Sequence, residues 1–293
     1  MKFSLIVPTI NRVHETKRLF QSLVAQDYDN LEVIIVDQNP DDRLVKLVDS
    51  YRQHFPILHV RESKRGQSRA RNIGFSQVKG DIVAFPDDDC LYPDGLLTLT
   101  AQFFDNNPQL DGVIGRVYDL EEDQNAFAPC GDDRSQEVDY AKGYKICVSC
   151  AMFFRAPVVE KIRFDERLGP GADTPWGCGD ETDYLFQCLN AGYQFYYDAN
   201  LIVRHPNPLK KNNFRQQIQR EYGYGLGKGY FLATHTLPQS LLKFEQSVSY
   251  ADALSEISKG HLRRASYFLV NGIGTSLGYR AGSKNIRQLK NCN

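Results

Sequence analysis

The stretch Ile82-Val83-Ala84-Phe85-Pro86-Asp87-Asp88-Asp89 joins a short apolar run to three consecutive carboxylates. The apolar run predicts a buried strand that ends at Phe85. Three neighbouring carboxylates repel one another, and a bound cation removes that cost. Oxygen ligands of this kind select Mg²⁺ or Mn²⁺. The alternative is a solvated acidic turn, but the position directly after a predicted strand favours a functional site.

Strands and helices alternate on the N-terminal side of this stretch. Apolar runs at Phe3–Val7, Leu31–Val36 and Ile57–Val60 predict strands, and helical spacing between them covers His14–Gln26 and Ser68–Val78. This alternation predicts an α/β fold with a mostly parallel sheet flanked by helices. Ligands of such sheets bind beyond the carboxyl ends of the strands, so the residues that follow each strand are the site candidates.

The second half of the sequence predicts a mixed continuation of the same sheet. A strand is expected at Gly112–Tyr118, then an acidic insertion of low order from Glu121 to Asp139, and an apolar strand at Cys147–Phe154. Apolar positions at helical spacing predict a helix over Asp180–Ala191, which Gly192 ends. We expect one main domain over residues 1–210 and a C-terminal helical extension over residues 211–293.

The bulk composition excludes several classes of protein. Of the 293 residues 42% are hydrophobic and 24% charged, and a formal net charge of −1 argues against nucleic-acid binding. Seven irregularly spaced cysteines in a chain of this size indicate reduced thiols in a cytosolic protein. The first apolar run is too short for a signal peptide, and Ala265–Tyr279 falls short of a bilayer span.

The C-terminal extension is basic and aromatic. From Lys259 to the end it carries seven Lys or Arg residues and no acid. This asymmetry predicts a helix that lies on an anionic membrane surface; the alternative is a helix that covers the core and has solvated charges. The glycine-rich segment Gly223–Gly229 lacks the spacing of a phosphate-binding loop and is expected to be a mobile loop on the acceptor side.

Four segments, taken in order, resemble glycosyltransferase family 2, which has the Rossmann-like GT-A fold, over about the first 210 residues. The first strand is followed by Pro8, Thr9, Asn11 and Arg12, and the second ends at Asp37. Gly66 and Ala70-Arg71-Asn72-Gly74 match the G-x-x-x-A-R-N-x-G stretch of the family. The triplet resembles the D-x-D segment, and Gly179-Asp180-Glu181-Thr182-Asp183 resembles the acidic motif on the acceptor side.

The resemblance implies a role for each matching residue. Asp89 would be the principal ligand of Mn²⁺ or Mg²⁺, with Asp87 beside it on the donor side. Asp88 has the least defined role of the three. Pro8, Thr9, Asn11, Arg12, Asp37 and Arg71 would surround the nucleotide. His205, which follows the strand Ala199–Val203, lies where some proteins of this fold place a further metal ligand, although a structural histidine is the competing interpretation.

On the acceptor side the resemblance implies a catalytic base. Glu181 is preferred by position and Asp180 comes second, because the usual order of the two acids is reversed here. Trp176 and Asp183 are candidates for acceptor contacts, Trp176 through the stacking of its ring on a sugar; core packing is the alternative. On the donor side, Gln38-Asn39-Pro40 stands where the family usually has a second Asp followed by Gly-Ser. This departure leaves the nucleobase of the donor open.

The resemblance implies an inverting, metal-dependent hexosyltransferase of cell-surface polysaccharide synthesis. The default donor is a UDP-hexose, with a dTDP sugar as the alternative, and the acceptor is a glycan or lipid-linked glycan. The enzyme would act in the cytoplasm, at the membrane surface if the C-terminal extension binds lipid. A catalytically silent nucleotide-sugar-binding protein is the competing function. A sugar-phosphate nucleotidyltransferase is less consistent, because no glycine follows the first strand in Pro8–Arg12.

Overall fold

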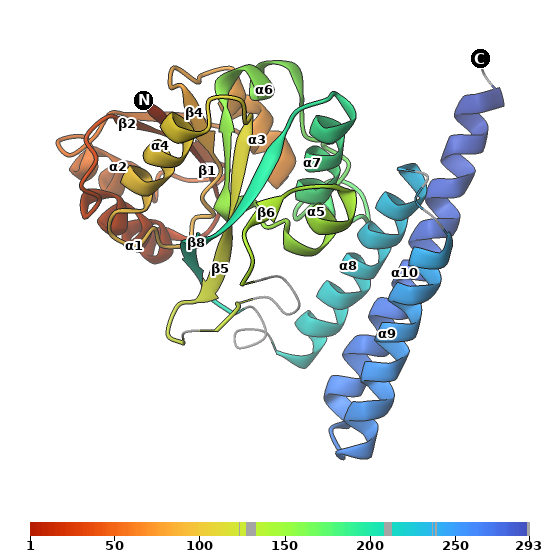
Figure 1. The fold of residues 1–293 in the computed structure, drawn as a ribbon. Helices are drawn as coiled ribbons and strands as arrows, with labels where there is room; N and C mark the ends of the chain where they lie inside the picture. The colour runs from red at the N-terminus through yellow and green to blue at the C-terminus, as the bar shows by residue number, and fades with distance from the viewer. Residues whose placement is uncertain (123, 127–132, 208–212, 236, 238, 292–293) are drawn as a thin grey trace. The chain divides into compact units, whose positions relative to one another are not determined.

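The computed structural model describes residues 1–122, 124–126, 133–207, 213–235, 237 and 239–291, with only the backbone over 287–291 (Figure 1). The chain divides into two compact units. The first, the sheet unit, comprises Met1–Arg65, Arg69–Phe164 and Tyr184–Asn207. The second, the helical unit, comprises Gly66–Ser68, Asp165–Asp183 and Pro208–Asn293. The predicted boundary at residues 210–211 lies outside the described residues.

The sheet unit is built on one mixed sheet of eight strands in the order β3-β2-β1-β4-β7-β5-β8-β6. Its strands are β1 Phe3–Thr9, β2 Leu31–Asp37, β3 Ile57–Arg61, β4 Ile82–Ala84, β5 Gly112–Asp119, β6 Gln136–Glu137, β7 Met152–Arg155 and β8 Phe195–His205. β1 runs parallel to β2 and β4, β2 to β3, and β5 to β8; β7 and β6 are antiparallel to their neighbours. The predicted α/β fold with a mixed, mostly parallel sheet is confirmed.

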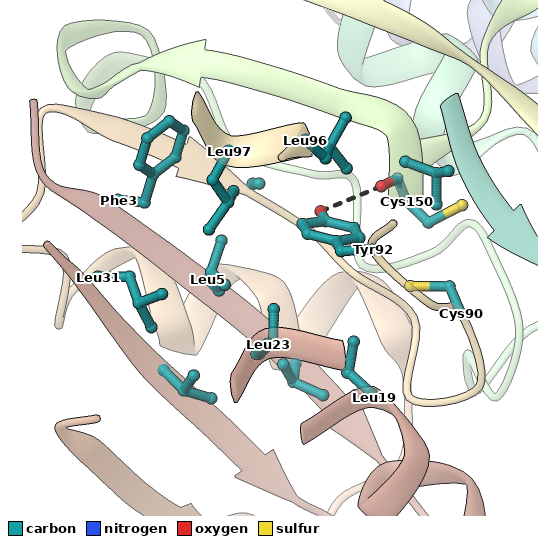
Figure 2. Close-up of a cluster of buried hydrophobic side chains, with 14 of the residues drawn as sticks. Phe3, Leu5, Leu19, Leu23, Leu31, Cys90, Tyr92, Leu96, Leu97 and Cys150 are labelled. Atoms are coloured by element: carbon teal, nitrogen blue, oxygen red, sulfur yellow. Dashed lines mark hydrogen bonds between the residues drawn. The ribbon is translucent and has the colours of Figure 1, made fainter. Parts of the chain in front are cut away.

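Helices cover both faces of this sheet, and each face has its own core. The helices of the sheet unit, with the shared α3 and α7, are α1 Val13–Val24, α2 Val45–Tyr51, α3 Gln67–Phe75, α4 Leu96–Asn106, α5 Tyr140–Ile146, α6 Ala156–Lys161 and α7 Asp180–Asn190. Leu19 and Leu23 of α1 and Leu97 of α4 pack on Phe3 and Leu5 of β1 (Figure 2). Residues of α3, α6 and α7 line the other core. β1 and β2 are buried along their whole length, and their successive side chains point to opposite faces, so both strands supply both cores.

The region predicted as one apolar strand at Cys147–Phe154 is only partly a strand. Helix α5 precedes it, where the Asp139 side chain accepts a hydrogen bond from the Lys142 backbone N–H and caps the first turn. A 3₁₀ turn covers Ser149–Ala151, and the strand β7 begins at Met152. The 3₁₀ turn therefore shortens the strand that apolar composition alone predicts.

The helical unit contains α8 Phe214–Thr234, α9 Gln239–Ser258 and α10 Leu262–Asn291. Asn213 and Gln216 form a reciprocal capping box at the start of α8. α9 lies beside α10, joined by a hydrogen bond of 2.7 Å from Gln246 Nε2 to Ser276 Oγ. None of the helices described is long and apolar enough to cross a membrane.

The prediction of a mobile loop at Gly223–Gly229 is wrong, because these residues lie within α8. Their glycines allow α8 and α10 to pack backbone against backbone. A Cβ added at Gly225 would lie 2.2 Å from the Asn271 carbonyl oxygen, and one added at Gly229 would lie 2.0 Å from that of Thr275. Tertiary packing thus compensates for the low helix propensity of these glycines.

Candidate active site

The acid triplet lies at the carboxyl end of the sheet, where β1, β4 and β8 end. Leu91, just after the triplet, exchanges backbone hydrogen bonds of 2.8 and 3.0 Å with Arg204 of β8. This bridge holds the end of β8 beside the turn, so that His205 Nε2 lies 3.3 Å from Asp89 Oδ1 and 3.7 Å from Asp87 Oδ2. The structure therefore brings together the three residues that the sequence predicts as metal ligands.

Arg12 approaches the same acids from the loop between β1 and α1. Its NH1 atom lies 2.6 Å from Asp88 Oδ1 and 2.8 Å from Asp89 Oδ2. Both carboxylates are almost fully buried, whereas the Arg12 side chain is 44% exposed. A group that is partly in solvent and partly on the acids is placed to interact with an incoming anion, such as a phosphate, as well as with the triplet.

Arg71 of α3 has no exposed side-chain surface. Its NH2 atom donates to Ser149 Oγ at 2.7 Å and to Asp87 Oδ1 at 3.3 Å, and the guanidinium lies over the ring of Phe164, 5.1 Å from the centroid. The sequence-based interpretation placed Arg71 at the nucleotide. In the structure it holds Asp87 in position from inside the core.

Three cations of the chain therefore surround the three carboxylates. Burial raises the pKa of Asp88 to about 7, although Arg12 opposes the change, and burial also raises the pKa of Asp87. Burial alone would lower the pKa of His205, but its hydrogen bond to Asp89 and the other nearby negative groups outweigh it and raise the pKa to about 9. The site favours a protonated His205 when only the chain's own charges are present.

The side chains of this cluster match a hard divalent cation in donor chemistry. Asp87 and Asp89 supply carboxylate oxygens and His205 a ring nitrogen, a combination that Mn²⁺ accepts. In the described ranges, however, no three His, Cys, Asp or Glu side chains already form a metal-binding group. His205 pairs directly with the two acids instead. To bind to these carboxylates and to His205, a metal ion would therefore have to displace the proton that His205 carries on the ring nitrogen facing them.

Asp37 ends β2 and is fully buried beneath a pocket. Its carboxylate accepts from the backbone N–H and side-chain Nδ2 of Asn39 at 2.9 and 2.7 Å, and pairs with His59 Nε2 at 2.9 Å and Arg61 NH1 at 3.2 Å. The pocket has a volume of about 500 Å³ and is lined by Gln38, Asn39, Pro40, Arg61, Glu62, Ser63 and Arg65. Asp37 therefore orients the wall of this pocket, and Asn39 and Arg61 present the polar groups to it.

The first loop connects this pocket to the acid cluster. Asn11 has a φ of 59°, and its backbone N–H donates to Asn39 Oδ1 at 2.6 Å. Pro8 and Thr9 are buried at the end of β1, and the Thr9 hydroxyl is hydrogen-bonded to Asp88. Hydrogen bonds of the first loop thus link the residues that follow β1, β2 and β4, whereas Arg71 lies inside the core.

The predicted acceptor-side acids lie in the helical unit, in the first turn of α7. Asp180 is 1% exposed, and its carboxylate lies so close to Gly169 that a Cβ at Gly169 would be 2.7 Å from the Asp180 Cγ. Glu181 is only half-buried. Of these two acids, Glu181 is therefore the one whose side chain is partly exposed to solvent.

Asp183 and Trp176 each have a partner from α8 within the helical unit. His235 Nε2, at the end of α8, lies 2.7 Å from Asp183 Oδ1. The Trp176 ring stacks on Tyr230, with the centroids 4.6 Å apart and the planes inclined by 16°. Trp176 is half-buried, so one side of the indole is supported by Tyr230, which suits a ring that offers its other side to a sugar.

Sequence reasoning missed several residues at these sites. Arg61 could have been found, because it ends β3 and the ends of strands are where ligands bind. His59, Ser149, Tyr230 and His235 carry no local signal, since each acquires its role only through a contact with a distant part of the chain.

A family model described as "Glycosyl transferase family 2" matches residues 4–163, which is more than half of the chain. The match spans β1 to α6 and includes the acid triplet, Arg12, Asp37 and Arg71. It ends before the acids of α7 and before His205. The family model therefore covers the donor-side half of the predicted site.

Two relatives are similar to parts of the chain. An uncharacterized glycosyltransferase of Haemophilus influenzae is 38% identical over 112 residues, which cover 38% of this chain and 37% of the relative. The poly(ribitol-phosphate) β-N-acetylglucosaminyltransferase TarS of Staphylococcus aureus is 31% identical over 126 residues, covering 40% of this chain and 22% of TarS. The matches thus span well under half the length of these relatives.

Solved structures share the fold at low sequence identity. The crystal structure of S. aureus TarS 1-349 in complex with UDP-GlcNAc has a TM-score of 0.55 and 20% identity, covering 98% of this chain and 92% of that one. The mannosyltransferase PcManGT of Pyrobaculum calidifontis, in complex with GDP-Man and Mn²⁺, has a TM-score of 0.61 and 16% identity, covering 94% and 86%. These similarities confirm the GT-A fold.

Proposed function

Because this chain belongs to glycosyl transferase family 2, we propose that it transfers a sugar from a nucleotide-diphosphate donor to a hydroxyl group of a glycan acceptor, with inversion at the anomeric carbon. The observation that carries this proposal is the cluster of Asp87, Asp89 and His205 at the carboxyl end of the sheet. Two acids that follow β4 and a histidine that ends β8 fit a role in binding a diphosphate and its cation.

We propose that the donor is a UDP-hexose, with a dTDP sugar as the alternative. The pocket at the end of β2 is the candidate site for the base, with Asn39 and Arg61 as the polar contacts. The UDP-GlcNAc in the similar TarS structure supports UDP, whereas GDP-Man in PcManGT shows that proteins of this fold also accept a purine nucleotide.

The proposed enzyme requires Mn²⁺ or Mg²⁺, held by Asp89, Asp87 and His205. Such a cation neutralises the charge that develops on a departing diphosphate. Arg12 is proposed to move from the carboxylates of Asp88 and Asp89 to the diphosphate when the donor binds. Arg71 keeps Asp87 oriented throughout, because its own contacts lie inside the core.

Glu181 is proposed as the general base. The acceptor hydroxyl gives its proton to the Glu181 carboxylate while its oxygen forms the new bond to the anomeric carbon. The bond from that carbon to the diphosphate oxygen breaks, and its electron pair leaves with the nucleoside diphosphate. Asp180 is the second candidate, and Trp176 and Asp183 are proposed to bind the acceptor.

We further propose that the product belongs to a cell-surface polysaccharide and that the reaction takes place in the cytoplasm. The similarity to TarS, a poly(ribitol-phosphate) β-N-acetylglucosaminyltransferase, supports an acceptor of this class. A glycan or a lipid-linked glycan would each supply the required hydroxyl.

Release of nucleoside diphosphate from a panel of UDP, dTDP and GDP sugars tests the function. We expect release with at least one donor in Mn²⁺ and its loss in chelator. Asp89→Asn should lower the rate at least about 100-fold, since the transition state loses charge stabilisation. Asp94→Asn, an exposed acid just after the site, is the matched control and should turn over normally.

The competing function is a catalytically silent nucleotide-sugar-binding protein. The neutralisation of the triplet by Arg12, Arg71 and His205 favours this alternative, because the acids are tolerated without a metal. Saturable binding of a nucleotide sugar, with no release from any donor and acceptor pair, would establish the silent function and overturn the transferase.

A further inference from the structure

One face of α10 carries aliphatic side chains that no other described part of the helical unit covers. Leu262, Leu269, Ile273 and Leu277 are 68%, 38%, 48% and 40% exposed. Their spacing of seven, four and four residues places them in one row along the helix. α10 contacts α9 through Gly272 and Ser276 and α8 through Gly274 and Gly278, so this row is its free side.

α9 adds exposed aliphatic residues next to this row. Leu254 and Ile257 are 67% and 44% exposed. They follow Tyr250 at helical spacing, and the Tyr250 ring lies beside Gly272 of α10. We define the apolar face of the hairpin α9–α10 (Figure 1) as Leu254, Ile257, Leu262, Leu269, Ile273 and Leu277. Large uncovered aliphatic groups in this number mark an interaction surface rather than scattered exposure.

Basic side chains border the apolar face. Arg280 and Lys284 follow Ile273 and Leu277 at a spacing of seven residues and continue the same row, and both are exposed. Arg263, exposed as well, lies near the start of the helix, with its guanidinium over the ring of Phe214, 5.1 Å from the centroid. α10 itself carries no acid, and Glu256 of α9 pairs with Lys259 and His261. The surface therefore combines an apolar row with positive charge at its C-terminal end.

We propose that the apolar face of α9–α10 docks onto an anionic phospholipid surface, with the hairpin lying in the plane of the membrane. The aliphatic row would enter the boundary between head groups and acyl chains, and Arg280 and Lys284 would contact lipid phosphates. A second copy of the chain fits this face less well, since it would bring Arg280 and Lys284 towards equally basic surfaces. The docking does not depend on the transferase activity proposed above.

Flotation of the full chain with lipid vesicles tests this docking. We expect binding to vesicles that contain phosphatidylglycerol, little binding to vesicles of phosphatidylcholine alone, and weaker binding in 0.5 M than in 0.1 M salt. Arg280→Gln with Lys284→Gln should lower the partition coefficient about 25-fold, because each positive charge removed lowers it about fivefold. Leu269→Gln with Ile273→Gln should weaken it about tenfold.

Leu99→Gln is the matched control, because Leu99 is 49% exposed on α4 of the sheet unit and should not affect flotation. All the substituted side chains are exposed, so circular dichroism should show the wild-type helix content. Unchanged flotation of both double variants would overturn the proposal. So would sedimentation showing a wild-type dimer that Leu269→Gln with Ile273→Gln converts to monomer. Binding of nucleotide sugar in solution is expected to be normal in every variant, which separates this test from that of the transferase.

Discussion

His205 Nε2 lies 3.3 Å from Asp89 Oδ1, and this contact joins the last residue of β8 to the acid triplet beyond β4. The His205 side chain is 12% exposed and that of Asp89 6%, so the pair is shielded from solvent. The contact links the proton on His205 to the charge of a predicted metal ligand. Its consequences can be measured in the metal-free protein.

The stability that His205 contributes should depend on pH. The pKa of His205 is about 9 in the folded chain, against about 6.5 in an unfolded one. A raised pKa means that the contribution is complete below about pH 6.5 and is lost as the pH rises through 9. In chelator, His205→Gln should be less stable by up to about 3 kcal/mol near pH 6.5, and the deficit should shrink towards pH 9.5. Urea unfolding measures it; a deficit that stays constant over this range would contradict the assignment.

Arg71 should be needed for stability as well as for the orientation of Asp87. Arg71→Met leaves a buried carboxylate without its cation and should cost about 3 kcal/mol or more. Arg71→Lys cannot reproduce the hydrogen bond to Ser149 together with the stacking on Phe164, and should be intermediate. Arg69→Met on the same helix is the control: Arg69 is 32% exposed and pairs with Glu62, so the loss should be below about 1 kcal/mol. Equal losses at the two positions would show that Arg71 is not a special support.

Substitution of the two acids at the start of α7, Asp180 and Glu181, should have different effects on turnover and on stability. Glu181→Gln is expected to lower turnover by at least about 100-fold while nucleotide-sugar binding, measured by calorimetry, stays within about twofold. Asp180→Asn should lower thermal stability more than Glu181→Gln does, since Asp180 is buried against Gly169. Near-normal turnover of Glu181→Gln would move the role of base to Asp180.

Two glycines of α8 should respond to alanine with opposite signs. A Cβ at Gly229 would lie 2.0 Å from a backbone oxygen of α10, so Gly229→Ala must push the helices apart and should destabilise the helical unit by about 1–3 kcal/mol. At Gly223 the nearest atom to an added Cβ is 3.9 Å away, and Gly223→Ala should stabilise α8 by about 0.5–1 kcal/mol. Thermal unfolding followed by circular dichroism compares them; destabilisation by both would mean that helix contact is not the cause.

Local patterns were sufficient to predict much of the sheet unit. The strands β1, β2, β3 and β4 fall where the sequence predicts them. β1, β2 and β4 are buried throughout, and a buried parallel strand needs a continuous apolar run whatever surrounds it. The helix that begins at Asp180 and stops before Gly192 is also confirmed. Its signals are local too: apolar residues at helical spacing, and a glycine with a φ of 87° just after its end. The failures lie where a distant partner overrides the local signal, as in the glycine-rich part of α8.

The α/β fold and the acids at the ends of its strands follow from local patterns in the chain, since periodicity and strand-end position are properties of neighbouring residues. The groups that surround those acids depend on tertiary contacts. Arg12, Arg71 and His205 come from three different elements, and no spacing in the chain relates them. The triplet Asp87-Asp88-Asp89 requires opposite charge because burial makes uncompensated carboxylates costly, and the fold provides that charge through contacts between residues far apart in sequence.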